Sequence, residues 1–404
     1  MLKLLVVAPT CDGTDVGEAW VAHQWVSRLA ARHDVTLLTY HKRGRTPAAE
    51  QLSGLRVIEW AETPVVGRAE RLNSMLKPAY FPFYAKARRW IREARARGEH
   101  FDLAHQPVPV AMRYPTPVAG LGIPYLVGPV GGSLDSPVAF RAEEGTSPWF
   151  VGLRSFDSLR IRHDPMLRKS YEDAAIVLGI APYVRDNLAG LSIKRFEVLS
   201  ETAIDGVAPV VDRSGRTGPL RLLFVGRLIR TKGVRDAVRA MAQLRDVAAV
   251  LDVIGDGPER EVCEALVAEL GLAGRVRFHG RLPREEIDAY YRDADLFVFP
   301  SYREPGGNVA FEAMSFGLPL IVCDRGGPGN VVDDSCGIAL PAVSPEQLAA
   351  AVAGAVRELA ADPSRRLSLG AGARQRVQRI ALWDSKIDDV DALYEQILAA
   401  GVTR

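Results

Sequence analysis

Short apolar runs alternate with stretches of helical spacing along most of the chain, and this alternation restricts the fold more than any other feature. In the first half the predicted strands are Leu4–Ala8, Val35–Thr39, Arg56–Trp60, Leu103–His105, Pro124–Val127, Ala175–Gly179 and Phe196–Leu199. Strands that are joined through helices pair in parallel and are covered by helices on both faces. The first half therefore predicts an α/β domain with a parallel sheet.

The alternation begins again after a polar, glycine-containing stretch between Leu199 and Pro219, which is a natural domain boundary. The predicted strands that follow are Arg221–Val225, Val250–Ile254, Val276–His279, Leu296–Phe299 and Leu320–Cys323. The predicted helices are Val234–Leu244, Glu259–Leu270, Arg284–Asp293 and one that begins at Asn308. We predict two Rossmann-like, doubly wound domains, residues 1–200 and 201–382, that face each other across a cleft.

Two further helical regions are predicted. After Pro345 the sequence is helical and rich in alanine to about Ile380, and a last helix follows from Trp383 to Leu398. After the first strand, Asp15 and Glu18 have the spacing of a capping box, so we expect them to start the first helix.

The composition is typical of a soluble globular protein, with 48% hydrophobic and 25% charged residues in a chain of 404. No apolar run reaches the roughly 18–20 residues that a membrane-spanning helix needs, and Met1–Pro9 predicts a strand rather than a signal peptide. The four cysteines are Cys11, Cys263, Cys323 and Cys336. Their spacing fits no metal site, which favours free thiols and a cytoplasmic location.

The net charge of +2 is unevenly distributed, because the first 200 residues carry six more basic than acidic side chains. Two groups contribute much of this excess: Arg88, Arg89, Arg92, Arg95 and Arg97, and Arg154, Arg160, Arg162, Arg168 and Lys169. Such groups are most simply the solvated faces of helices. They would also attract an anionic surface or acceptor, and the sequence leaves both interpretations open.

Residues 301–317 predict a loop that follows a buried strand and leads into the helix at Asn308. Gly306 and Gly307 let the loop backbone approach a ligand closely. A helix N-terminus reached in this way is a ready anion site.

Two carboxylates flank this anion site: Glu304 in the loop and Glu312 about one turn into the helix. That position suits sugar hydroxyls better than phosphate. An ordinary strand, loop and helix with a surface glutamate at each end would show the same pattern, so the pair gains weight only from a second motif.

The second motif lies at residues 224–233, where an apolar strand runs into Gly226 and two cations, Arg227 and Lys232, bracket the following turn. Cations at the carboxyl end of a strand suit a diphosphate, because arginine donates as a fork and lysine acts as a mobile point charge. A surface loop with two solvated cations is the simpler alternative. The two motifs together favour a nucleotide-sugar site.

Both motifs resemble those of retaining glycosyltransferase family 4: Glu304 and Glu312 with seven residues between them, and the strand-Gly-Arg…Lys-Gly pattern of Arg227 and Lys232. The resemblance covers nearly all of the second half and only loosely the first. It implies the GT-B fold, in which the last segment, residues 383–404, returns to the first domain. It also implies transfer of a sugar from a nucleoside diphosphate sugar with retention of the anomeric configuration.

The resemblance also implies roles for individual residues. The implied catalytic residues are Glu304, Arg227, Lys232 and His105. The implied donor-binding residues are Gly17, Gly226, Arg227, Lys232, Arg281, Glu304, Gly306, Gly307, Asn308, Val309 and Glu312. No Asp-x-Asp metal motif stands near these residues, so we expect neither a metal nor another cofactor. The two cations and the helix N-terminus would then meet the charge on the leaving diphosphate.

The first domain matches the family less closely. His105 ends a predicted strand, as does a family histidine that faces the cleft, but a glycine-rich loop at 128–133 stands where many members place another histidine. The candidate acceptor residues are Asp12, Asp15, Gly131 and Gly132.

The acceptor class stays open in the sequence. The acidic groups Asp12, Asp15, Glu143 and Glu144 would suit a cationic small molecule such as an aminocyclitol, whereas the arginine groups would suit a lipid-linked or phosphorylated acceptor. The absence of an obvious membrane-docking helix favours a small molecule, and the donor base is UDP or GDP. We expect a monomer or homodimer without a nucleic-acid partner.

Three other functions agree less well with the sequence. A UDP-sugar 2-epimerase shares the fold but has no need of an acceptor, and the pattern at Arg227 and Lys232 argues against it. A catalytically inactive binding partner is disfavoured because Glu304 and Glu312 are both present. An inverting transferase would ordinarily carry a histidine base in the first loop, and residues 9–17 contain none.

Overall fold

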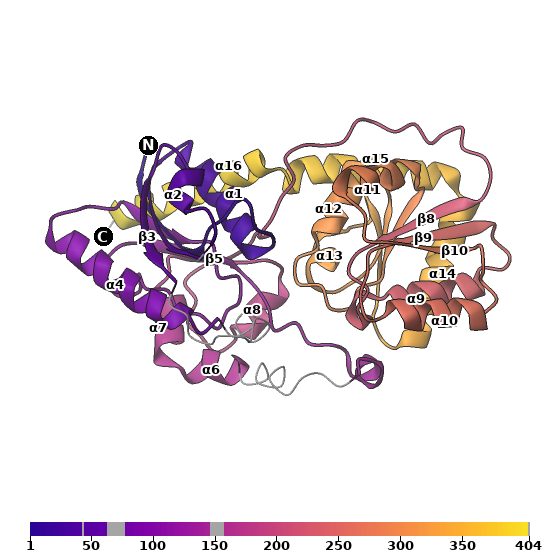
Figure 1. Ribbon diagram of the computed structural model, residues 1–404, viewed down its shortest axis with the longest axis horizontal. Coiled ribbons are helices and arrows are strands. Elements are labelled where there is room, and N and C mark those ends of the chain that lie inside the picture. Colours follow the sequence, from indigo (N-terminus) through magenta and orange to yellow (C-terminus); the bar gives the residue numbers. More distant parts are fainter. Residues whose placement is uncertain (43, 63–76, 146–156, 403–404) are drawn as a thin grey trace. The chain divides into compact units, whose positions relative to one another are not determined.

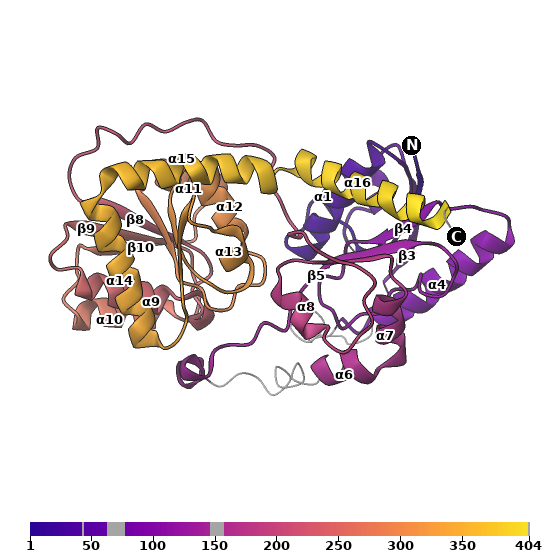
Figure 2. The same ribbon diagram turned by 180° about the vertical axis from the view of Figure 1, so that it is seen from behind.

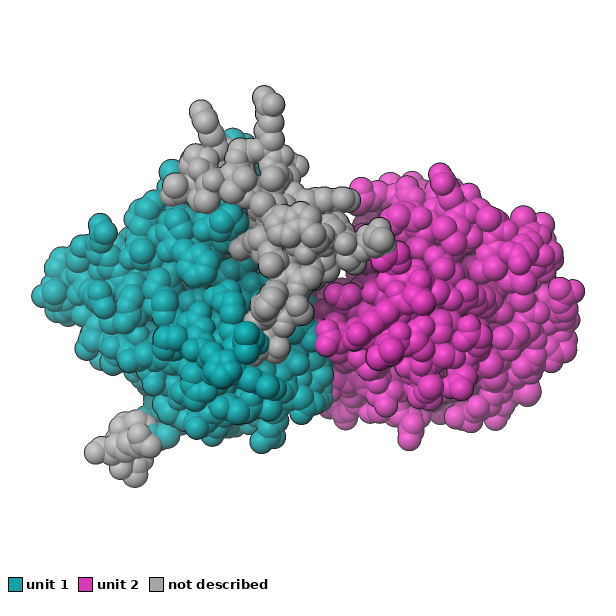
Figure 3. Space-filling model, turned by 90° about the horizontal axis from the view of Figure 1, so that it is seen from below, with its two compact units in different colours: residues 1–133, 148–201, 387–404 teal, residues 134–147, 202–386 magenta. Residues whose placement is uncertain are grey.

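The structure, a computed structural model, describes residues 1–42, 44–62, 77–145 and 157–402. The chain divides into two compact units, coloured separately in Figure 3. Unit 1 comprises Met1–Ser133, Pro148–Glu201 and Ile387–Arg404, and unit 2 comprises Leu134–Ser147 and Thr202–Lys386.

Unit 1 is built on a seven-stranded sheet in the order β3-β2-β1-β4-β5-β6-β7, in which all neighbouring strands are parallel (Figure 1). Its strands are β1 Lys3–Thr10, β2 Asp34–His41, β3 Arg56–Ala61, β4 Leu103–Gln106, β5 Tyr125–Val130, β6 Ile176–Gly179 and β7 Phe196–Val198. The inner strands are almost entirely buried, since helices cover both faces of a parallel sheet.

The described helices of unit 1 are α1 Glu18–Ala30, α2 Ala48–Gln51, α4 Tyr80–Ala96, α6 Asp157–His163, α7 Pro165–Glu172, α8 Tyr183–Asn187 and, from Ile387 on, α16 Trp383–Val402. Helix α16 lies beside α1 in both ribbon views (Figure 2). There Arg32, just after α1, pairs with Asp388 and Asp391 of α16.

Unit 2 contains a six-stranded parallel sheet in the order β10-β9-β8-β11-β12-β13. Its strands are β8 Leu220–Val225, β9 Ala249–Ile254, β10 Val276–Gly280, β11 Leu296–Phe299, β12 Leu320–Cys323 and β13 Gly337–Leu340. Its α-helices are α9 Val234–Gln243, α10 Arg260–Glu269, α11 Arg284–Asp293, α12 Asn308–Ser315, α13 Gly326–Val331, α14 Pro345–Ala361 and α15 Pro363–Ile380. Two short 3-10 turns, η1 Val138–Glu143 and η3 Arg230–Lys232, complete the described elements of this unit.

The predicted α/β class and the two parallel sheets are confirmed. Every predicted strand is present, with bounds that move by at most three residues. One strand, β13 at Gly337–Leu340, was not predicted. The predicted domain boundary after residue 200 lies one residue from the division at Glu201. Unit 2 also takes up Leu134–Ser147, which the sequence did not indicate.

The predicted capping box of the first helix is wrong. The N-cap of α1 is Gly17, and no side chain caps this helix. Asp15 instead pairs with Lys42, and Glu18 Oε1 accepts a hydrogen bond from the Val110 amide at 2.6 Å. Both carboxylates thus bind groups that are distant in sequence, and neither caps the helix.

Candidate functional site

The two predicted motifs meet at one edge of the sheet of unit 2. Strands β8 and β11 are parallel neighbours, with Leu296 beside Leu222 and Phe297 beside Leu223. Their carboxyl ends therefore lie together, and the loop after each strand starts from the same edge. This is the edge at which open α/β sheets bind ligands.

Lys232, after β8, and Glu304, after β11, form an ion pair in which Lys232 Nζ donates to Glu304 Oε2. The two side chains are 14% and 17% exposed, so the pair is largely shielded but can still be reached by a ligand. A diphosphate oxygen would be an alternative partner for the ammonium, and sugar hydroxyls would be alternative partners for the carboxylate.

Two backbone contacts hold these loops together. The buried Ser301 hydroxyl donates to the Thr231 carbonyl at 3.0 Å. Gly233, at φ +77°, packs so closely that a Cβ there would lie 2.1 Å from the Pro300 carbonyl oxygen. A larger residue would force the two loops apart, so the glycine after Lys232 is needed for the approach.

Helix α12 presents its first turn to the same edge. Its N-cap is Gly307 in the left-handed conformation at φ 101°, and no side chain caps it. Asn308 is therefore the first helical residue and not the cap. Uncapped amides at a helix N-terminus attract anions.

The other predicted donor residues differ in exposure. Arg227 and Arg281 are exposed, and neither has an ion-pair partner among the residues that the structure describes. Gly226 and Gly306 are half-buried on the same loops, and Val309 is half-buried in the first turn of α12. Arg227 is thus a cation free to meet an anion.

Glu312 projects from the first turn and a half of α12 and is 17% exposed. Its Oε1 accepts from Arg284 of α11, and its Oε2 accepts from the buried Tyr291 hydroxyl at 3.1 Å. The Arg284 side chain is 56% exposed, so a ligand hydroxyl could displace it. His279, interpreted as a satisfied loop histidine, contacts Asp252 and Tyr290 through its two ring nitrogens.

His105 does not face a ligand site in this structure. Its ring is fully buried on β4, where Nε2 donates to the Gly128 carbonyl at 2.7 Å and Nδ1 accepts from the Tyr394 hydroxyl at 2.5 Å. Burial lowers the pKa of His105 to about 4, although the Gly128 contact opposes this shift. The environment is that of a neutral histidine that ties α16 to the sheet of unit 1.

We predict that His105 makes unit 1 less stable in mild acid. Its pKa is about 4 when folded against an ordinary 6.5, so the unfolded chain binds the extra proton between these values. Its contribution is complete above pH 6.5 and falls as the pH drops, by about 2 kcal/mol between pH 7 and pH 5. Calorimetry should show a smaller fall in Tm over that range for His105→Gln than for the unchanged protein. Equal falls would contradict the assignment.

The acidic residues proposed for a cationic acceptor are already engaged. Asp12 is 6% exposed and accepts from Thr14 and Gln51. Asp15 pairs with Lys42 and Arg45. Glu143 pairs with three arginines and Glu144 with Arg303. These carboxylates are therefore not free to bind a cationic acceptor such as an aminocyclitol.

The remaining first-half candidates are glycines in unit 1. Gly17 starts α1 at φ 66°. Gly131 lies in an isolated bridge with Ala111, and the Gly132 amide donates to the Tyr183 hydroxyl at 3.3 Å. None of these contacts involves a group that distinguishes one acceptor class from another.

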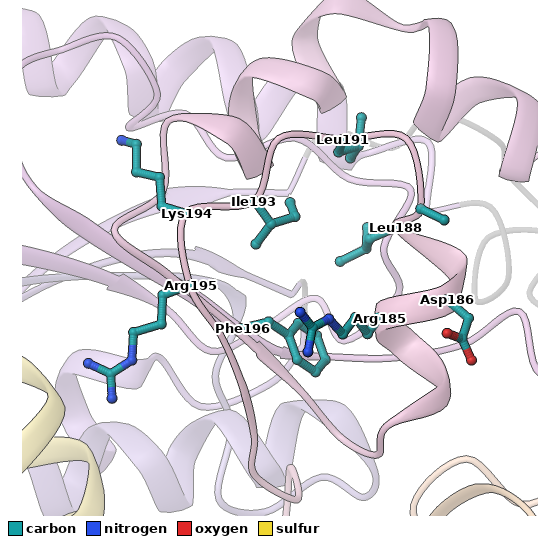
Figure 4. A pocket seen from close by; sticks show the side chains of 9 residues that line it. Arg185, Asp186, Leu188, Leu191, Ile193, Lys194, Arg195 and Phe196 are labelled. Atoms are coloured by element: carbon teal, nitrogen blue, oxygen red, sulfur yellow. The ribbon is translucent and has the colours of Figure 1, made fainter.

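A cavity of about 400 Å³ lies in unit 1 between α8 and β7 (Figure 4). Leu188, Ile193 and Phe196 supply apolar lining, while Arg185 and Lys194 add charge at its edge. It contains none of the predicted site residues. In the described ranges no cluster of three or more His, Cys, Asp or Glu side chains could hold a metal, and no helix there is long and apolar enough to cross a bilayer.

Comparison with known proteins agrees with the motifs of unit 2. Residues 212–376 match the family described as "Glycosyl transferases group 1". A glycogen synthase of Mycobacterium tuberculosis is 34% identical over 180 residues, which are 44% of this chain and 42% of that protein. A 2-deoxystreptamine glucosyltransferase of Streptomyces kanamyceticus is 42% identical over 139 residues, 34% of this chain and 33% of the other. These two matches thus span less than half of either relative.

The fold extends over the whole chain. A sucrose-phosphate synthase from Thermosynechococcus elongatus superposes with a TM-score of 0.65 over 98% of this chain and 99% of that chain, at 22% identity. The likeness shows the fold, and the predicted GT-B architecture of two Rossmann-like domains is confirmed.

Proposed function

We propose, from the premise that the second half of this chain is a glycosyl transferases group 1 domain, that the protein is a retaining glycosyltransferase. It would move a hexose-type sugar from UDP- or GDP-sugar to a small-molecule acceptor. The observation that carries this proposal is the shielded pair of Lys232 and Glu304 on neighbouring loops at the carboxyl edge of the sheet.

The charges around that pair match a nucleoside diphosphate sugar. Lys232, the exposed Arg227 and the uncapped N-terminus of α12 supply positive charge for the diphosphate. As the bond from the anomeric carbon to the leaving diphosphate breaks, these groups stabilise the charge that builds on it. Because the protein would supply this charge itself, we propose that the reaction needs no metal ion.

The two glutamates would accept hydrogen bonds from the uncharged parts of the donor. Once Lys232 turns to the phosphate, Glu304 accepts hydrogen bonds from hydroxyls of the sugar. Glu312 accepts hydrogen bonds from the ribose hydroxyls, which take the place of the exposed Arg284 side chain. The acceptor hydroxyl would attack on the face from which the diphosphate leaves, and its proton would pass to the departing phosphate.

A small-molecule acceptor is supported by the likeness to the 2-deoxystreptamine glucosyltransferase. Two of the basic residues that could attract an anionic acceptor are committed elsewhere, since Arg88 and Arg95 on α4 donate to the carbonyls of Pro117, Ala119 and Leu121. We propose a cytoplasmic enzyme that acts on such a molecule.

The stereochemical outcome tests the mechanism. We expect an α-linked product from an α-linked donor, formed equally well with EDTA present. Thermal-shift titration with UDP, GDP, ADP and dTDP identifies the donor base, and proton NMR of the purified product then reports the anomeric coupling. A large diaxial coupling from a gluco-configured sugar would mean inversion and would refute the proposal.

A further inference from the structure

We propose that residues 134–145 form a positioning arm of the donor site, although they come from the first half of the sequence. The structure places this arm in unit 2, outside the span of residues 212–376 that matches the family. The inference rests on the proposed function, since it assigns the arm a role in holding the residues that bind the donor.

The arm enters the hydrophobic core of unit 2 through Phe140. This side chain is fully buried, and its ring lies 4.2 Å from that of Tyr302 on the loop after β11. The guanidinium of Arg230 lies 5.5 Å from the Phe140 ring and 5.3 Å from the Tyr302 ring. Because Arg230 begins the η3 turn that ends at Lys232, the two rings enclose the base of the lysine-bearing turn.

Glu143 fixes the same turn through charge. Its carboxylate accepts from Arg230 at 2.8 Å, from Arg235 at 3.4 Å and from Arg239 at 3.0 Å. Arg230 is 4% exposed and also makes a fork-shaped contact with the buried Asp236 at 2.6 and 2.9 Å. Burial would raise the pKa of Glu143, but Arg239 and Arg230 hold it below its usual range.

The arm also contacts the loop that carries Glu304. Arg303, the preceding residue, lies 3.7 Å from Glu144 and 3.5 Å from the Ser136 hydroxyl. Arg325, whose Nε donates to the Tyr302 carbonyl, donates through Nη2 to the Asp135 carbonyl at 2.6 Å. The arm therefore touches both loops of the Lys232–Glu304 pair, while among its described residues none forms a hydrogen bond or ion pair with the side chain of Lys232 or Glu304.

Two opposite effects on diphosphate binding can be expected for Glu143→Gln. If Glu143 acted only through its negative charge, removing that charge would leave the site more positive and tighten diphosphate binding. If it positions the Arg230–Lys232 turn, three neighbouring arginines lose their shared partner and the turn loosens. We expect the second effect to dominate, with a fivefold to thirtyfold rise in the donor KM and in the Kd for the nucleoside diphosphate.

The experiment compares Glu143→Gln with Asp135→Asn in the full chain. Asp135 is an exposed residue of the same arm, and among the described residues its carboxylate has no ion pair, while its backbone carbonyl accepts from Arg325. Asp135→Asn therefore matches the charge change without the positioning change. We expect Asp135→Asn to stay within twofold of the unchanged protein. Glu143→Gln should keep its kcat at saturating donor, whereas simple loss of folded protein would lower kcat and leave KM unchanged. Glu143→Asp, which keeps the charge, should restore part of the affinity.

Hydrogen exchange separates this inference from the proposed function. Amides of residues 228–239 should exchange faster in unliganded Glu143→Gln than in Asp135→Asn. If the exchange rates of these amides are unchanged, or if Glu143→Gln binds nucleotide as tightly as the unchanged protein or more tightly, the positioning role of the arm is wrong. Failure of the unchanged protein to bind any nucleoside diphosphate would overturn the proposed function instead, and the exchange data would still decide whether the arm holds the turn.

Discussion

Replacing Lys232 with alanine is expected to weaken nucleoside diphosphate binding by about 2–4 kcal/mol, the cost of losing a charge-assisted contact in a closed site. The loss has two parts. The ammonium no longer meets the phosphate, and Glu304, which pairs with Lys232 in this structure, is left as an uncompensated carboxylate beside the incoming diphosphate. Isothermal titration calorimetry with the nucleotide chosen by thermal shift measures the sum.

The double variant Lys232→Ala/Glu304→Gln separates these parts. Removing the orphaned carboxylate should recover about tenfold in affinity relative to Lys232→Ala, because close charges couple by an amount of that order. Arg221→Ala is the matched control, since Arg221 is an exposed cation of the same unit whose only described ion pair is with the exposed Asp293. Unchanged affinity in both Lys232→Ala and Arg227→Ala would end the diphosphate assignment.

The meeting of Lys232 and Glu304 follows from topology, which explains why the sequence could predict it. Each residue lies a few positions beyond a short apolar strand, and parallel strands send their carboxyl ends to one edge. Once β8 and β11 are recognised, the loops that follow them must start from that edge. Gly226 after β8, the glycine pair Gly306 and Gly307, and the helix at Asn308 add local signals that need no long-range information.

Other features depend on contacts between distant segments and leave no local trace. The capping box at Asp15 failed because Lys42, twenty-seven positions later, captured the carboxylate. His105 was expected to face a ligand, yet Tyr394, 289 positions away, accounts for one of its ring nitrogens. The hydrophobic periodicity of two residues in a strand or 3.6 in a helix predicts which face a side chain occupies, but not which distant residue packs against it.

The contacts of the positioning arm are the clearest example of features that the sequence could not predict. Glu143 and Glu144 look like free acidic groups in the sequence, and only the fold brings Arg230, Arg239 and Arg303 to them. Phe140 is one aromatic residue in a polar stretch, so no periodicity marks it as a core residue. A buried side chain in a segment without a pattern can be found only from the assembled unit.

The second large effect is expected for Glu304→Gln, which should lower kcat/KM about 10²- to 10³-fold, the usual cost of removing one preorganised polar group from a reacting centre. Free nucleoside diphosphate should bind as before or slightly more tightly, because the amide no longer competes with phosphate for Lys232. Steady-state kinetics with the donor sugar and calorimetry with the nucleotide alone give the two numbers on one protein preparation.

Glu312→Gln should behave in the opposite way, because its carboxylate is assigned to the ribose and not to the reacting sugar. The nucleotide itself should bind more weakly, while turnover at saturating donor falls little. Arg284→Gln serves as the control: it removes the side chain that occupies Oε1 in this structure and should leave nucleotide affinity equal or stronger. If Glu304→Gln lost nucleotide affinity and Glu312→Gln did not, the two carboxylates would have exchanged roles, and the donor would lie in the reverse direction along this edge of the sheet.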